Sequence, residues 1–113
     1  MSSPSIRAGE LNRQITIQAR SATKDSFGQE STTWTDVITC FASISPLSGR
    51  ELIAAQAQVA ETTHEIQIRY RNWVTPANRV KYQGRVFNIL NVLDEDMRHK
   101  SLRLLCSEGL NQG

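Results

Sequence analysis

The sequence lacks any long apolar segment, and this absence excludes a simple membrane-spanning protein. The longest unbroken apolar run is Leu52–Ala55, whereas a membrane-spanning helix needs about 20 mostly apolar residues. The start, Met1–Ser5, has no apolar stretch behind a basic residue, so no secretory signal is predicted. With 39% apolar residues in 113, the chain is too apolar for a disordered tail. We expect one soluble domain, made in the cytoplasm and without a membrane partner.

Cysteine is scarce, and its arrangement argues against a disulfide or a structural zinc site. Cys40 and Cys106 are the only two, and each lies inside an apolar stretch. A chain without an export signal folds in a reducing compartment, so two buried thiols are expected. Neither histidine has a cysteine or another histidine at zinc-ligand spacing.

Potential metal ligands gather at one place, the acidic run Asp94–Asp96 with His99. Carboxylates and an imidazole can together hold a metal ion. Consecutive residues point in different directions, however, so we interpret this run as a solvated hairpin tip. We therefore expect no metal and no cofactor.

Catalytic signatures are also absent. The sequence contains no phosphate-binding loop, dinucleotide-binding glycine motif, nucleophile elbow or metalloprotease motif. His64 falls on the apolar side of an alternating segment, which favours a position in the core or at the mouth of a barrel. Ser48 has no histidine or aspartate in a context that would activate it as a nucleophile. The sequence predicts a protein that is not an enzyme and has no catalytic residues.

The charge is nearly balanced overall but unevenly distributed along the chain. Lysine and arginine number 13 and the acids 11, so the net charge is +2. From Arg69 to Arg103 there are eight basic and three acidic residues, whereas the rest holds five basic and eight acidic residues. This asymmetry indicates a surface that meets an anionic partner or an oppositely charged copy, or a solvated face.

Six segments alternate between apolar and polar residues or are rich in β-branched residues, which predicts strands. The segments are Leu11–Arg20, Trp34–Ile44, Thr63–Tyr70, Arg79–Tyr82, Arg85–Leu93 and Leu102–Cys106. Turn residues fill the connection Ser21–Gln29, and Gln83-Gly84 forms a tight hairpin. The sequence thus predicts a mainly β fold, a small antiparallel β-barrel or sandwich of about six strands.

Two of these segments make specific packing predictions. In the second, Trp34 shares one side with the apolar residues from Ile38 to Ile44, and only Asp36 is out of place. In Val86–Leu93 both sides are apolar, so both faces of that strand must be covered. We expect the cover to be a short helix or a neighbouring subunit.

A long central loop interrupts the strands between Pro46 and Thr62, and we call it the excursion. It opens with a proline and a glycine, and Arg50–Gln58 is rich in helix formers, which predicts about two helical turns. So short a helix is not stable alone, and loops of this length are usually functional or mobile. We expect an arm at 1–10, one barrel domain at 11–107 that contains the excursion at 46–62, and a tail at 108–113.

Aromatic and basic residues leave a second function open, a small oligonucleotide-binding barrel that reads single strands. The aromatic candidates for base stacking are Trp34, Tyr70, Trp73, Tyr82 and Phe87. The basic candidates for phosphate contacts are Arg69, Arg71, Arg79, Lys81 and Arg85. Because aromatic residues in small barrels are mostly packing residues, this function is kept as the alternative.

Three stretches of the sequence carry a resemblance to a known family. They are Ile6–Gln18, then Phe27-Gly28 with Trp34–Val37 and Phe41–Glu51, and last Ile68–Arg71, Arg79-Val80 and Gly84–Ile89. From Ile6 to about Cys106, the chain resembles the head-tail joining proteins of long-tailed bacteriophages, also called head-closure, stopper or head-tail adaptor proteins.

The resemblance implies a structural virion protein at the head-tail interface that closes the DNA-filled head. It implies a hexameric or dodecameric ring beneath the phage portal and its adaptor ring, with a docking face for the tail terminator or tail tube protein. Packaged double-stranded DNA in the channel would be a non-specific partner.

The resemblance also implies roles for two groups of residues. Those expected to plug or line the channel, or to act in assembly, are Ser48, Gly49, Arg50, Glu51, Leu52 and Gln56. The five basic candidates for phosphate contacts would instead face a neighbouring subunit or DNA. Because a ring needs two complementary faces on each subunit, the acidic portion Asp25–Glu65 can meet the basic portion Arg69–Arg103 of a neighbour.

Overall fold

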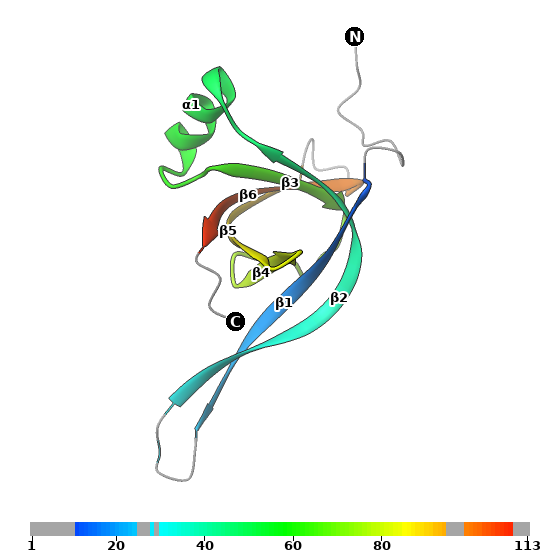
Figure 1. The fold of residues 1–113 in the computed structure, drawn as a ribbon, viewed down its shortest axis with the longest axis vertical. Helices are drawn as coiled ribbons and strands as arrows, with labels where there is room; N and C mark the ends of the chain where they lie inside the picture. Colours follow the sequence, from blue (N-terminus) through cyan, green and yellow to red (C-terminus); the bar gives the residue numbers. More distant parts are fainter. Residues whose placement is uncertain (1–10, 25–27, 29, 95–98, 110–113) are drawn as a thin grey trace.

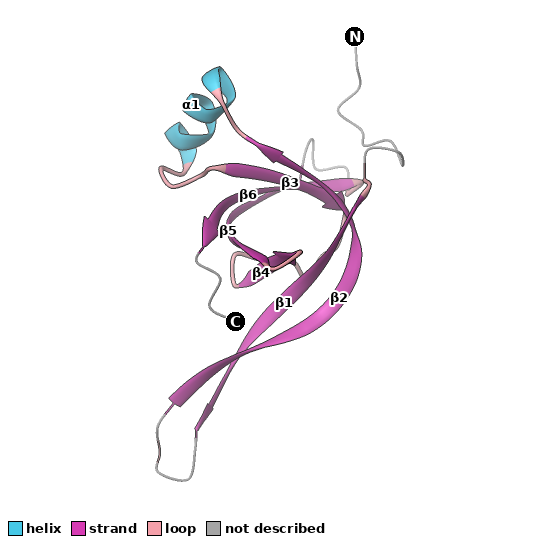
Figure 2. Ribbon diagram, in the orientation of Figure 1, coloured by secondary structure: helices cyan, strands magenta, loops and turns pink. Residues whose placement is uncertain are grey.

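Six strands form one closed antiparallel barrel in the order β1-β2-β3-β6-β5-β4 (Figure 1). The computed structural model describes residues 11–24, 28, 30–94 and 99–109, apart from the side chains of residues 22–24 and 30–32. The strands are β1 (Arg13–Lys24), β2 (Glu30–Pro46), β3 (His64–Arg69), β4 (Asn78–Tyr82), β5 (Arg85–Asp94) and β6 (Ser101–Gly109). The described residues contain one helix, α1 (Gly49–Gln58), which is not long and apolar enough to cross a membrane (Figure 2). The predicted mainly β, six-stranded antiparallel fold is confirmed.

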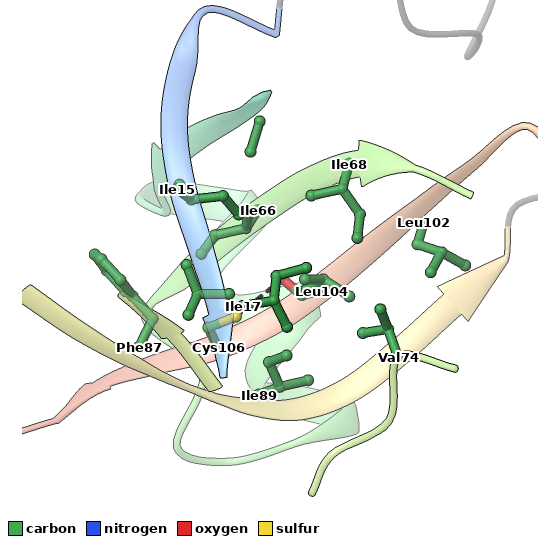
Figure 3. Close-up of a cluster of buried hydrophobic side chains, with 12 residues drawn as sticks. Ile15, Ile17, Ile66, Ile68, Val74, Phe87, Ile89, Leu102, Leu104 and Cys106 are labelled. Atoms are coloured by element: carbon green, nitrogen blue, oxygen red, sulfur yellow. Dashed lines mark hydrogen bonds between the residues drawn. The ribbon is translucent and has the colours of Figure 1, made fainter. Parts of the chain in front are cut away.

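Apolar side chains from every strand fill the barrel interior (Figure 3). Ile17, Ile66 and Leu104 have no exposed surface, and the Phe87 ring is likewise fully buried among them. Cys106 lies in this core and Cys40 is half-buried against it, both as free thiols. Burial raises the pKa of the Cys106 thiol to about 12, so this thiol stays protonated and unreactive.

A β-bulge in β2 changes which side chains face the core. β1 Ile17 is paired with Ile38 and the next residue, Gln18, with Asp36, so Val37 has no partner on β1. One extra residue reverses the alternation beyond the bulge. The prediction that Trp34 shares the core side with Ile38 is therefore wrong, because Trp34 and Asp36 contact outward-facing side chains of β1 and β4.

The first two strands continue past the barrel as a two-stranded ribbon (Figure 1). Ser21–Lys24, which the turn-rich composition assigned to a loop, belong to β1 and are paired with Glu30–Thr33 of β2. Cross-strand pairing overrides the local turn preference of serine and threonine. The ribbon contributes to an elongated shape of 59 × 27 × 27 Å.

The apolar outer face of β5 follows from a second bulge and lies across a groove from α1. The pairing of β5 with β6 skips Leu90, so Val92 rather than Leu93 packs against the core. Leu93 then lies outside the barrel, where it lines a groove with Leu105 of β6 and residues of α1. Because α1 faces Leu93 across this groove and is not packed on it, the expected cover, a short helix or a neighbouring subunit, stays a prediction.

Candidate assembly surfaces

The excursion projects from one end of the molecule, and the β1–β2 ribbon projects from the other (Figures 1 and 2). The two ends of the excursion lie side by side, because Pro46 of β2 is paired with His64 of β3. α1 begins at Gly49, whose φ of 57° is a conformation that favours glycine, and Ser48 gives the helix no side-chain cap. A backbone turn rather than a cap therefore sets the start of the helix.

Hydrogen bonds fasten the base of the excursion to itself and to Thr63, the residue before β3. Thr62 is fully buried, and its hydroxyl donates to the Val59 carbonyl at 2.8 Å. The Gln56 side chain donates to the Thr62 carbonyl at 3.0 Å, and the Leu47 amide donates to the Thr63 carbonyl at 3.0 Å. The base is consequently well bonded, although α1 itself has little apolar surface to bury.

A groove of about 360 Å³ separates α1 from the outer face of the barrel. Ala55 is the only buried residue of α1, and Leu52 is half-buried. Glu51 faces the groove, whose opposite wall carries the ion pair between Arg103 and Glu65. The six excursion residues expected to act in the channel or in assembly lie on α1 or directly before it. Of these six, Glu51 lines the groove, and Gln56 is bonded within the excursion. The side chain of Ile53, which was not among those six, is 71% exposed.

The basic residues expected to face a partner do not form one patch, and Arg79 has partners within its own chain. Its Nε donates to Oε1 of Gln18 at 2.7 Å, and its guanidinium lies 4.2 Å from the centre of the Trp34 ring. The Gln18 amide in turn donates to Asp36 at 2.8 Å. Burial lowers the pKa of Arg79, which nevertheless remains charged. This cluster fixes the base of the ribbon to β4.

Arg85 is also engaged, at the mouth of the barrel. Its Nε and Nη2 atoms donate to the two carboxylate oxygens of Glu108, each at 2.9 Å. These hydrogen bonds lower the pKa of Glu108 and raise that of Arg85. The guanidinium also lies 5.2 Å from the Phe87 ring centre. Arg85 therefore closes one end of the core.

The same mouth holds His64, which agrees with the position expected from its apolar parity. Its ring meets the Phe87 ring edge to face, with the centroids 5.0 Å apart, and its Nδ1 lies 2.9 Å from the Thr63 hydroxyl. Burial lowers the pKa of His64, Glu108 raises it and Arg85 lowers it.

Three basic candidates have no carboxylate partner among the described residues: Arg69, Arg71 and Lys81. Lys81 is half-buried on β4, beside Thr16 of β1. Arg69 and Arg71 line a cleft next to β2, away from Lys81. The five basic residues thus fall into three groups. Arg79 and Arg85 bond to groups of their own chain, Lys81 lies alone on β4, and Arg69 with Arg71, which we call the arginine pair, line the cleft.

In the acidic run, the structure describes contacts between Asp94 and His99. Asp94 accepts a hydrogen bond from the His99 amide at 3.1 Å and lies 3.3 Å from Nε2 of the same residue. The His99 ring also stacks on Tyr70, with the centroids 4.5 Å apart. Glu95 and Asp96 lie outside the described residues. Among the residues that are described, no group of three or more potential metal ligands gathers.

The aromatic residues considered for base stacking mostly have other contacts. Phe87 is in the core, and Tyr70 and Tyr82 pack against it. The Trp34 ring is under the Arg79 guanidinium, and Trp73 is 36% exposed. The structure therefore provides no row of exposed rings, among the described residues, on which successive bases would stack.

Sequence reasoning missed the polar cluster around Gln18 and the apolar surface of β2. Asp36 was noted as an exception to the alternation, and an exception beside an extra valine is the signal of a bulge that would have found the cluster. Phe41, 57% exposed on β2, has the parity opposite to Ile38 and Cys40, and an apolar residue on the outer side of a strand is the signal that would have found this surface.

Comparisons with known proteins agree with the resemblance noted in the sequence. The family model described as "Phage head completion protein" matches residues 6–109. The chain is 26% identical to head completion protein gp7 of Enterobacteria phage HK97, over 92% of this chain and 97% of that protein. Both comparisons are to structural virion proteins rather than to enzymes.

Two solved structures share the fold. Protein SF1141 of Shigella flexneri 2a, known from its solution structure, is 35% identical, with a TM-score of 0.78 over 95% of this chain and all of that one. A chain in the virion of a native gene transfer agent is 19% identical, with a TM-score of 0.61 over 88% of this chain and 96% of that chain, and it supports the fold alone. The expected relationship is confirmed: the chain belongs to the phage head completion protein family and is a virion component.

Proposed function

We propose that this chain joins the DNA-filled head of a phage to its tail, as one subunit of a ring that closes the DNA exit channel. The observation that carries the proposal is the extent of the family match, which runs from residue 6 to residue 109 and includes the excursion as well as the barrel. The relative from phage HK97 is also named a head completion protein, and the match covers nearly its full length. The portal or adaptor ring would lie above, and the tail terminator or tail tube protein below.

The excursion is the part that we assign to the channel or to contacts between subunits. In a ring, the excursions of all subunits are arranged symmetrically around one axis. α1 stands off the barrel with the exposed charges of Arg50 and Glu51 and with the exposed Ile53. Exposed side chains on a projecting helix are available for contacts with neighbouring subunits, whether the excursion plugs the channel or lines it.

For contacts with DNA or with a neighbouring subunit, the arginine pair and Lys81 are better candidates than Arg79 and Arg85. The latter two already bond to groups of their own chain. Contacts with packaged DNA would be to phosphates and would carry no sequence information.

The direct test uses purified DNA-filled heads that lack this protein. Addition of the protein should retain DNA in the heads, create a ring visible by electron microscopy and allow tails to join. The double variant Arg50→Glu with Ile53→Ser should fold normally but fail to join, whereas the matched control Lys100→Glu should join normally. Heads that join tails equally well without the protein would refute the proposal.

A nucleic-acid assay separates the proposal from the oligonucleotide-binding alternative. Binding to DNA should be weak, independent of sequence and lost as salt is raised, because only a few phosphates are neutralised. Tight and salt-resistant binding to one single-stranded sequence would favour the alternative.

A further inference from the structure

The barrel is closed unevenly between β2 and β3. Only Ser43–Pro46 of β2 are paired with β3, opposite His64–Gln67. The rest of β2, residues 30–42, is paired with β1 along one edge. Its other edge has no strand partner among the described residues. An unpaired edge presents a row of backbone donors and acceptors that another strand can use.

A cleft of about 450 Å³ lies where β2 and the end of β3 separate. One wall is the unpaired edge of β2, and the other is the end of β3 with the residues that follow. The lining residues are Leu11, Thr39, Cys40, Phe41, Arg69 and Arg71. The cleft thus combines a free strand edge, apolar side chains and two guanidinium groups.

The charge in this cleft is uncompensated. No acidic residue among the described ones lines it, and neither Arg69 nor Arg71 forms an ion pair with any described residue. The Nε atom of Arg71 is buried and has no hydrogen-bond partner, although the guanidinium lies near the Cys40 thiol and lowers its pKa against the larger effect of burial. Two guanidinium groups without an acidic partner among the described residues favour an incoming carboxylate, to which they can form charge-assisted hydrogen bonds.

The second observation is the apolar surface beside these charges. Both Phe41, which is 57% exposed, and the buried Leu11 line the cleft. Strand addition in known complexes uses main-chain hydrogen bonds for affinity and side-chain pockets for specificity. The cleft supplies both, with a site for a carboxylate and a site for an apolar side chain.

We propose that this cleft binds an extended, carboxylate-bearing segment of another protein as an added strand along residues 39–41 of β2. The carboxylate would bond to Arg69 and Arg71, and an apolar neighbour would cover Phe41. This interaction surface goes beyond the proposed function, because its occupant is a strand of another protein rather than DNA or a neighbouring subunit of the ring.

The strand acids whose side chains the structure describes are already engaged, which disfavours a second copy of this chain as the occupant. Glu65 pairs with Arg103, and Glu108 pairs with Arg85. Asp36 accepts from Gln18, and Asp94 from the His99 amide. The free acids Glu51 and Glu61 lie on α1 and on a turn rather than on a strand. The occupant is therefore a different polypeptide.

Titration of the full-length protein with model peptides, followed by amide NMR, tests this docking site. The probe is a blocked nine-residue peptide of alternating threonine and valine, with glutamate at its third and fifth positions. We expect saturable shifts at residues 39–41 and 69–71, with a Kd below about 1 mM. A lysine-bearing counterpart should not bind, and a backbone N-methylated counterpart should bind at least about tenfold more weakly, because it cannot pair with the strand edge.

Protein variants separate the two elements of the site. Arg69→Ala and Arg71→Lys should each weaken the glutamate peptide about tenfold, whereas the exposed Lys100→Ala should not change its binding. Absence of shifts at the cleft at about 1 mM peptide would overturn the proposal.

Equal binding by the lysine or N-methylated peptide would also overturn the proposal. Self-association abolished by Arg69→Glu would assign the cleft to a second copy, and contacts from residues 2–10 of the same chain would assign it to the arm. Either result would also overturn the proposal.

Discussion

The barrel interior and the excursion bury their apolar side chains to very different extents. Ile17, Ile66 and Phe87 are fully buried within a core that all six strands supply. In α1 only Ala55 is buried, while the larger Ile53 is almost wholly exposed. Since burial of apolar surface is the main favourable term in folding, the barrel can be stable alone. The excursion depends on hydrogen bonds at its base and on whatever covers it.

The largest effect that would sharpen this contrast is a cavity in the core. Phe87→Ala should lower the free energy of unfolding by about 3–5 kcal/mol, because it removes a fully buried ring. The matched change in the excursion, Ile53→Ala, should alter the stability of the free protein by less than about 0.5 kcal/mol. Urea unfolding measured by circular dichroism compares the two. Equal losses would show that the excursion belongs to the same cooperative core.

Proteolysis gives the next largest difference. Trypsin should cut the free protein after Arg50 about a hundredfold faster than after Arg69 or Arg85, because local opening of α1 costs much less than unfolding of the barrel. Mass spectrometry of timed digests locates the cuts, and assembly on heads should protect the bond after Arg50. If a verified monomer resists cleavage there as long as it does at the strand sites, the excursion is rigid.

A smaller effect is expected at the start of α1. Gly49→Ala should destabilise the helix by about 1–2 kcal/mol, because φ at this residue is 57° and the added Cβ is strained there. The space around Gly49 is open, so a steric clash makes no contribution. Amide hydrogen exchange should become faster in α1 and remain unchanged in β3. An unchanged exchange rate in α1 would mean that the helix start tolerates a side chain.

The smallest effect concerns the barrel mouth and pH. The folded state lowers the pKa of His64 below its ordinary value of about 6.5, so it binds fewer protons than the unfolded chain as the pH falls through that range. The stability contributed by neutral His64 is therefore lost as the pH falls from about 6.5 through the folded pKa. Glu108, whose pKa is also lowered, adds a loss below about 4.3. Both losses should be small, because Glu108 is exposed and His64 is only partly buried.

NMR titration of the His64 ring checks the direction of this shift. Glu108→Gln should lower the pKa of His64 further, since it removes the charge that raises it and leaves Arg85 in place. A pKa of His64 above that of a free histidine would contradict the arrangement of charges at the mouth.

Local patterns predicted the strands well where a strand has one regular buried face. The alternation in β3 and the hairpin between β4 and β5 correspond to the structure within one residue at most boundaries. The excursion helix was also predicted to within one residue at its start. These features depend on neighbours along the chain, which a single sequence contains.

Features that depend on distant residues could not be predicted in the same way. The bulge at Val37 follows from the register of β2 against β1, and it placed Trp34 and Asp36 on the outer face. Charge counting likewise could not show that Arg79 and Arg85 are bonded within their own chain. The bulge and these arginine contacts both depend on how strands far apart in the sequence are paired, and amino-acid composition does not specify that pairing.

The position of the excursion also has an evolutionary consequence. It leaves the barrel at Pro46 and returns at His64, and these two residues are paired neighbours on adjacent strands. An insertion whose ends already meet changes the entropy of loop closure only with the logarithm of its length. Descendants of this chain can therefore lengthen, shorten or replace the excursion at little thermodynamic cost, so that the loop can diversify with its partners while the barrel is inherited unchanged.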